Sequence, residues 1–178
     1  VNANSVISPR NALSYLIRLG VMRAKDSLEN QDTSEAITII KNLQQINPSD
    51  SSMLEDLYQL LVDSEKIDEA NKLFKTTYQI SKATVIRFPN HGQHNNNHAW
   101  LLSRCSKNLD EALEHANRAV QLEPDNGAFL DTLAEVHFQR GDRSKAIEFS
   151  EKAVNLLDGD AQVLRQLERF KNGDPSDR

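Results

Sequence analysis

The sequence holds one cysteine, Cys105, among its 178 residues, which excludes an internal disulfide framework. No apolar run approaches the roughly 18–20 residues that a membrane-spanning helix needs, so we expect no membrane insertion. The residues after Val1 lack a basic start followed by an apolar core, so we expect no secretory signal peptide and read the chain as a piece of a larger protein. These absences leave the compartment unknown. We expect a soluble protein and slightly favour the cytoplasm.

The chain is also poor in aromatic residues, glycine and proline. Aromatic residues make up 6% of it, and it has six glycines and five prolines. This balance suits thin helical layers better than a sandwich or an α/β sheet. The net charge is -5, and neither half has a basic excess, so we expect no nucleic-acid partner.

Motifs of common enzymes are missing. The sequence contains no Gly-rich phosphate loop, H-E-x-x-H, G-x-S-x-G or C-x-x-C pattern. Cys105 lies near Arg104 and Lys107, whose charge could activate a thiol, but no histidine is placed beside it as a base. We therefore expect that the chain is not an enzyme and needs no cofactor.

A repeat is visible in four segments that begin with a polar pair followed by alanine. These alanines are Ala36, Ala70, Ala112 and Ala146. The first two and the last two are each 34 residues apart, whereas the middle spacing is 42. Because one period occurs twice independently, we interpret the chain as a helical-repeat protein. A side chain as small as alanine lets two helix axes approach to about 8–10 Å.

Helix-stopping residues fall at matching points of this repeat. Pro48 and Pro124 each follow an alanine by 12 residues, and proline cannot donate a helical backbone hydrogen bond. Gly141 lies between two helical patterns, where its freedom in φ suits a tight turn. Between these stops, apolar residues recur at helical spacing. The pattern predicts successive helical hairpins.

Residues 125–157 resemble a tetratricopeptide repeat (TPR). The small and large residues of that pattern are present as Leu130, Leu133, Ala134, Gly141, Ala146 and Ala153, while His137 and Ser150 stand where aromatic residues are usual. Residues 96–126 resemble the repeats near the ends of large bacterial multi-TPR proteins. The resemblance covers roughly residues 17–157 and is weaker in the first two repeats. It implies an all-α fold: a right-handed α-solenoid of four TPR-like helical hairpins plus a C-terminal capping helix.

This organisation predicts five segments. They are an N-terminal tail (1–8), the first two repeats with a long first helix and an extended last helix (9–89), the third and fourth repeats (90–157), a capping helix (158–171) and a loose tail (172–178). We expect the second helix of the second repeat to run on past Ile80 into a loop.

Three histidines, His91, His94 and His98, form an H-x2-H-x3-H run that could bind zinc or copper. Metal ligands usually need a fixed frame, and this run lies in an Asn-rich segment that we expect to be a loop. We therefore expect solvated loop and helix-cap residues here and no metal site. A metal-responsive module stays an alternative.

The resemblance also implies a concave groove lined by the first helices of the hairpins. The groove positions carried over are Lys25, Glu55, Gln59, Val62, Asn96, Trp100, Arg104, Asp131, Glu135 and Phe138. We expect a protein–protein interaction scaffold that binds a peptide or helix of a partner there. Trp100 would be the anchor, unless it packs inside its own hairpin, and the acidic lining favours a neutral or basic segment. The alternative is a self-association or regulatory module attached to an enzyme domain of a larger parent protein.

Overall fold

The computed structural model describes the backbone of residues 9–46 and 51–173, without the side chains of residues 9–12, 51–53, 55 and 56. The predicted N-terminal tail and most of the predicted C-terminal tail lie outside the described residues. Within this part of the chain all regular secondary structure is α-helical, which confirms the all-α prediction.

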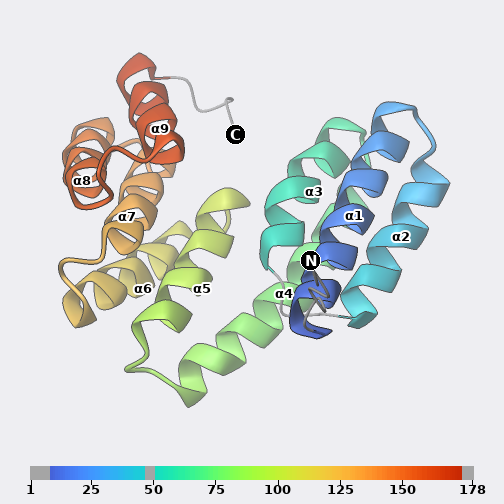
Figure 1. The fold of residues 1–178 in the computed structure, drawn as a ribbon, viewed down its shortest axis with the longest axis horizontal. Coiled ribbons are helices and arrows are strands. Elements are labelled where there is room, and N and C mark those ends of the chain that lie inside the picture. Colours follow the sequence, from blue (N-terminus) through green and yellow to red (C-terminus); the bar gives the residue numbers. More distant parts are fainter. Residues whose placement is uncertain (1–8, 47–50, 174–178) are drawn as a thin grey trace, which may run out of the picture. The chain divides into compact units, whose positions relative to one another are not determined.

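The described residues form nine helices (Figure 1). They are α1 (Pro9–Glu29), α2 (Thr33–Ile46), α3 (Ser51–Asp63), α4 (Ile67–Arg87), α5 (Gly92–Arg104), α6 (Leu109–Leu122), α7 (Gly127–Gln139), α8 (Arg143–Leu156) and α9 (Ala161–Asn172).

The chain divides into two compact units, Val1–Thr77 (unit 1) and Tyr78–Arg178 (unit 2). The division falls inside α4, whereas the repeat pattern placed the boundary after residue 89. Helix α4 does run on past Ile80, as predicted, and ends at Arg87. Its last turns therefore belong to unit 2.

In unit 1, α1 packs on α2 and on α3. The small residues Ala24 and Ala36 are fully buried, as expected where two helices pack closely. The turn between α1 and α2 contains Gln31 with a positive φ, and Asp32 then accepts a hydrogen bond from the backbone N–H of Glu35 at 3.0 Å. This cap starts α2 at the position that the repeat predicted.

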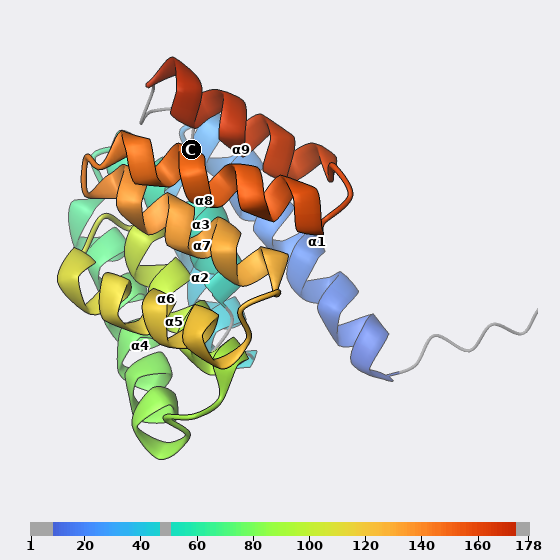
Figure 2. The ribbon, with the colours of Figure 1, turned by 90° about the vertical axis from the view of Figure 1, so that its left-hand side faces the viewer.

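In unit 2, α5 pairs with α6 and α7 pairs with α8, while α6 packs on α7 and α9 on α8 (Figure 2). The predicted helix-contact alanines Ala112, Ala134 and Ala146 are fully buried. Gly141 has a φ of 83° in the turn between α7 and α8, so the glycine serves the tight turn predicted there. Both hairpins of unit 2 follow from the sequence pattern.

Helix α9 covers the apolar side of the last hairpin, as predicted for a capping helix. Phe170 is fully buried against Phe138, with ring centroids 4.7 Å apart, and Ala134 and Ala146 complete this core. Asp160 caps the helix by accepting hydrogen bonds from the backbone N–H groups of Gln162 and Val163.

The structure corrects the expectation of a loop over the histidine run. Helix α5 begins at Gly92, so His94 and His98 lie on a helix. A Cβ at Gly92 would lie 2.5 Å from Glu123 Oε1 and 2.8 Å from Phe129 Cε2, so a larger residue would require these side chains to shift. We expected no metal site here because a loop would not hold the histidines in fixed positions. A helix does hold His94 and His98 in fixed positions.

Candidate functional site

The candidate site is a polar face of unit 2 built from α5, α7 and α9, which we call the polar face. It consists of Asn96, Trp100 and Arg104 on α5, Asp131 and Glu135 on α7, and Arg169 on α9. The α5 and α7 residues follow one another at four-residue spacing, so each set shares one side of its helix. These five are among the groove positions predicted from the sequence, and Arg169 is new.

Glu135 ties the three helices together. Its carboxylate is fully buried and pairs with the guanidinium of Arg169 on α9. Arg104 Nη1 on α5 lies 3.7 Å from Glu135 Oε1, and Gln139 Nε2 donates to the same oxygen at 2.7 Å. Ion pairs and hydrogen bonds with two guanidinium groups fix the position of this buried carboxylate. Glu135 is therefore a positioning residue with little surface of its own to offer a partner.

Asp131 differs from Glu135, one turn away on α7. Its side chain is buried, and Oδ1 has no hydrogen-bond partner among the described residues. Burial, together with the neighbouring Glu135 carboxylate, raises the pKa of Asp131 to about 7, although Arg169 opposes the shift. The carboxyl is therefore about half protonated at neutral pH, and an incoming cation would favour its charged form.

Two further buried polar atoms of this face lack a hydrogen-bond partner among the described residues, Asn96 Oδ1 and Arg104 Nε. Buried polar atoms without a partner are rare in folded proteins, and each costs about 1–3 kcal/mol. Three of the four such atoms among the described residues lie on this face, and the fourth is Ser150 Oγ on α8.

The aromatic residues expected in the groove have different surroundings. Trp100 is half-buried, and the Arg104 guanidinium lies 5.5 Å from its ring centroid. Phe138, 8% exposed, packs instead in the core with Phe170, so we no longer place it in the groove. The reason is α9, which covers the side of α7 from which Phe138 projects.

Unit 1 carries the remaining predicted groove residues. Lys25, Gln59 and Val62 are half-buried, and Gln59 Nε2 donates to Asp63 Oδ1 at 2.7 Å. The side chain of Glu55 lies outside the described residues. A single groove that runs through all four hairpins therefore stays a prediction.

Sequence reasoning missed Arg169 because α9 was interpreted only as a cap. Its apolar residues Val163, Leu167 and Phe170 gave the signal for that role. Arg169 directly precedes Phe170 in the sequence. A charged residue next to the apolar side of a terminal helix was the one sign that its side chain could be buried with a partner.

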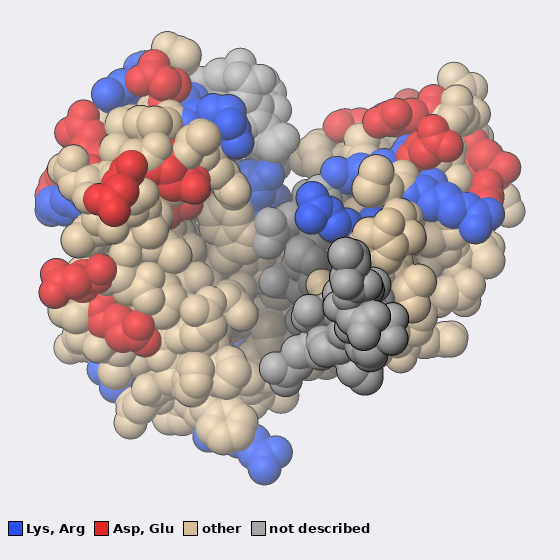
Figure 3. All heavy atoms as spheres, in the orientation of Figure 1, with Lys and Arg blue, Asp and Glu red and all other residues tan. Residues whose placement is uncertain are grey.

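Charged residues of both signs are interspersed over the described residues that Figure 3 shows, without a broad basic patch on that face. Among the described helices, none is long and apolar enough to cross a membrane. One group of possible metal-ligating side chains occurs in the described part of the chain, at His98, Glu111 and His115, none of which belongs to the polar face.

The comparison with protein families matches residues 106–167 to the model described as "Tetratricopeptide repeat". This stretch spans α6, α7 and α8 and reaches into α9. Residues 106–167 therefore match the tetratricopeptide-repeat family. Asp131 and Glu135 of the polar face lie within the matched residues, whereas the α5 residues of that face and Arg169 lie outside them.

Solved structures that match this chain include those of YrrB, MamA and pilF. YrrB, titled a TPR protein with an unusual peptide-binding site, is 14% identical over 88% of this chain and 98% of its own, with a TM-score of 0.47. MamA is 16% identical over 88% and 81%, with a TM-score of 0.45. The Pseudomonas aeruginosa protein pilF is 16% identical over 90% and 70%, with a TM-score of 0.46. We draw no functional argument from similarities this distant.

Proposed function

We propose that this chain is a protein-interaction scaffold that binds a segment of another protein on the polar face of unit 2. One observation carries this proposal: three buried polar atoms without a hydrogen-bond partner, Asn96 Oδ1, Arg104 Nε and Asp131 Oδ1, belong to the same face. Because the atoms are buried, a bound segment can pair with them only when the side chains turn outward, and it would then recover the cost of leaving them unpaired, about 1–3 kcal/mol each.

The chemistry of the three atoms describes the partner. Asp131 Oδ1 and Asn96 Oδ1 accept hydrogen bonds, so they favour donors such as lysine, arginine or a backbone N–H. Arg104 Nε donates, which suits a backbone carbonyl. A segment with one basic side chain and an accessible backbone fits this set, in line with the basic or neutral segment expected from the sequence.

Trp100 adds apolar surface beside these polar groups. A half-buried tryptophan is a frequent source of binding energy in interfaces, and its removal often costs ~2 kcal/mol or more. The neighbouring Arg104 guanidinium holds the ring against α5. We therefore keep Trp100 as the proposed anchor.

Affinity capture with matched variants tests the proposal. The wild-type chain, Trp100→Ala and Asp131→Asn would be immobilised separately, with Glu148→Gln as a control on an exposed part of α8. Retained proteins would be identified by mass spectrometry, and the segment responsible would be measured against each variant by calorimetry.

The proposal expects a partner segment that loses at least about tenfold in affinity with Trp100→Ala and with Asp131→Asn but not with Glu148→Gln. Equal binding to all four chains would contradict it and move the interface elsewhere. Recovery of this chain alone, with a mass that rises with concentration, would favour the alternative of a self-association module.

A further inference from the structure

Two histidines and a glutamate meet between α5 and α6, on another side of α5 than the polar face. Glu111 and His115 are four residues apart and share one side of α6, and His98 projects from α5. One possible ligand atom from each lies within 4.8 Å of the others, the only such group among the described residues. In the sequence, His98 belongs to a run with His91 and His94. In the structure the rings of His91 and His94 stack on each other, with centroids 4.0 Å apart.

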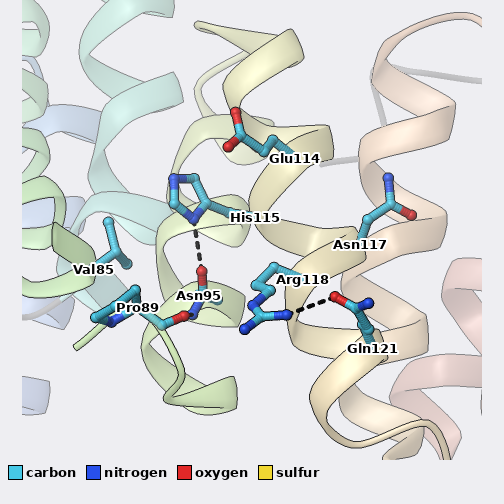
Figure 4. A pocket seen from close by; sticks show the side chains of 8 residues that line it. All are labelled: Val85, Pro89, Asn95, Glu114, His115, Asn117, Arg118 and Gln121. Atoms are coloured by element: carbon cyan, nitrogen blue, oxygen red, sulfur yellow. Dashed lines mark hydrogen bonds between the residues drawn. The ribbon is translucent and has the colours of Figure 1, made fainter.

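The hydrogen bonds of Asn95 fix the tautomer of His115. Asn95 Nδ2 donates to the backbone carbonyls of Pro89 and His91, each at 3.0 Å, so the amide is oriented with Oδ1 toward His115. That oxygen lies 2.7 Å from His115 Nδ1 and can only accept (Figure 4). The Nδ1 atom therefore carries the hydrogen. In the neutral ring the other nitrogen, which points away from Asn95 in Figure 4, keeps its lone pair.

His98 is oriented in a similar way. It is fully buried, and its Nδ1 lies 2.8 Å from Ser81 Oγ, which itself donates to the Tyr78 carbonyl at 3.2 Å. When Ser81 gives its hydrogen to that carbonyl, it accepts from Nδ1, and Nε2 holds the lone pair. This Nε2 faces Glu111 Oε1 at 3.2 Å. In this tautomer a cation can bridge the two acceptors, whereas in the other tautomer Nε2 donates to Glu111 directly.

We propose that His98, Glu111 and His115 bind a divalent transition-metal ion of the zinc type, through Nε2 of each histidine and the Glu111 carboxylate. Two histidines and one carboxylate form a known zinc ligand set. Ligating histidines almost always donate their other ring N–H to a fixed acceptor, the role that Ser81 and Asn95 have here.

The geometry is close to what the ion requires. Zinc bonds of about 2.0–2.2 Å place tetrahedral ligand atoms about 3.4 Å apart. The three candidate atoms lie within 4.8 Å of one another, so the widest pair would close by at most about 1.4 Å. Asn95 and His115 also line an open cavity of about 710 Å³, on the side of His115 that faces Asn95. A bound ion would link α5 to α6.

Lys82 is the competitor of the proposed ion. Its Nζ lies 3.2 Å from Glu111 Oε1 and 2.7 Å from the Tyr78 hydroxyl. The side chain is 45% exposed and can swing into solvent when a cation arrives. Tyr78, which donates to Glu111 Oε2 at 2.9 Å, keeps the carboxylate in place. Removal of the Lys82 charge should therefore strengthen metal binding.

Titration of the tag-free full chain with Co²⁺, followed by displacement with Zn²⁺, tests the proposal. We expect the visible absorption of tetrahedral Co²⁺ to saturate at one equivalent. His115→Gln and Glu111→Gln should weaken binding more than about 100-fold, and Ser81→Ala about 10–100-fold. Lys82→Met should strengthen it, a gain that misfolding cannot imitate. His91→Gln and His94→Gln are the matched controls and should bind as the wild type does.

Circular dichroism would establish that each variant is folded. A titration without a saturating absorption band would overturn the proposal. So would binding that depends on His91 and His94 but not on His115, because it would place the ion on the stacked pair at the start of α5. If no variant altered metal binding, the ion would be bound nonspecifically on the surface, and the proposal would be overturned as well.

Discussion

Replacement of Asp131 by asparagine tests whether its carboxyl is as strongly desolvated as the structure indicates. The side chain is buried, Oδ1 lacks a partner among the described residues, and the pKa is raised from 3.8 to about 7. An asparagine side chain at this position would have nearly the same shape without an ionisable group. The change should therefore alter how the stability of unit 2 depends on pH.

The sign follows from proton binding. The unfolded chain releases the Asp131 proton near pH 4 and the folded chain near pH 7, so between these values the folded state holds more protons. The contribution of Asp131 to the free energy of unfolding is therefore most favourable below pH 4 and is lost as the pH rises to 7. A shift of about 3 units corresponds to ~4 kcal/mol in total, of which about 2–3 kcal/mol falls between pH 5 and pH 8.

Urea unfolding followed by Trp100 fluorescence would measure this, because Trp100 is the one tryptophan of the chain and lies in unit 2. The wild type should lose about 2–3 kcal/mol more than Asp131→Asn between pH 5 and pH 8. Asp125→Asn, the same substitution at an exposed position, should keep the wild-type slope. If the free energy of unfolding depended on pH equally in the wild type and Asp131→Asn, the carboxyl would be solvated. The main reason to expect a basic partner on the polar face would then be lost.

Three further substitutions test the packing of unit 2, each by urea unfolding at pH 7. Glu135→Gln removes the buried carboxylate between two guanidinium groups and should cost about 3–5 kcal/mol; a loss below about 1 kcal/mol would contradict the buried network. Gly127→Ala places a Cβ 2.6 Å from Leu157 Cγ and should cost about 1–3 kcal/mol, unless α8 shifts freely. Phe170→Ala should cost about 3–5 kcal/mol because the ring is fully buried, whereas Leu164→Ala, on the exposed side of α9, should cost far less; similar losses would refute the capping role of α9.

Much of the fold could be read from local patterns. The alanine period placed the second helices of the hairpins, and the buried Ala112 and Ala146 confirm that reading. Apolar spacing on α9 predicted a capping helix, and the extension of α4 past Ile80 was also predicted. These features depend on neighbours three or four residues apart along one helix, which is the range over which a sequence pattern carries information.

The histidine segment shows where such patterns fail. Asn95, Asn96 and His98 are buried on α5, although their polarity indicated a loop. Their burial is tolerated because polar partners meet them from other elements, Ser81 from α4 for His98 and His115 from α6 for Asn95. No window along the sequence contains those partners.

The sequence by itself determined the helices, their hairpin pairing in unit 2 and the positions of five of the six residues on the polar face. The tertiary structure alone decided that Phe138 belongs to the core, that Arg169 joins Glu135, and that His98 meets Glu111 and His115. Hydrophobic periodicity specifies which side of a helix is buried, a property of each helix separately. Which polar groups meet, and which are left without a partner, depends on how helices distant in sequence pack together, and that is settled only in three dimensions.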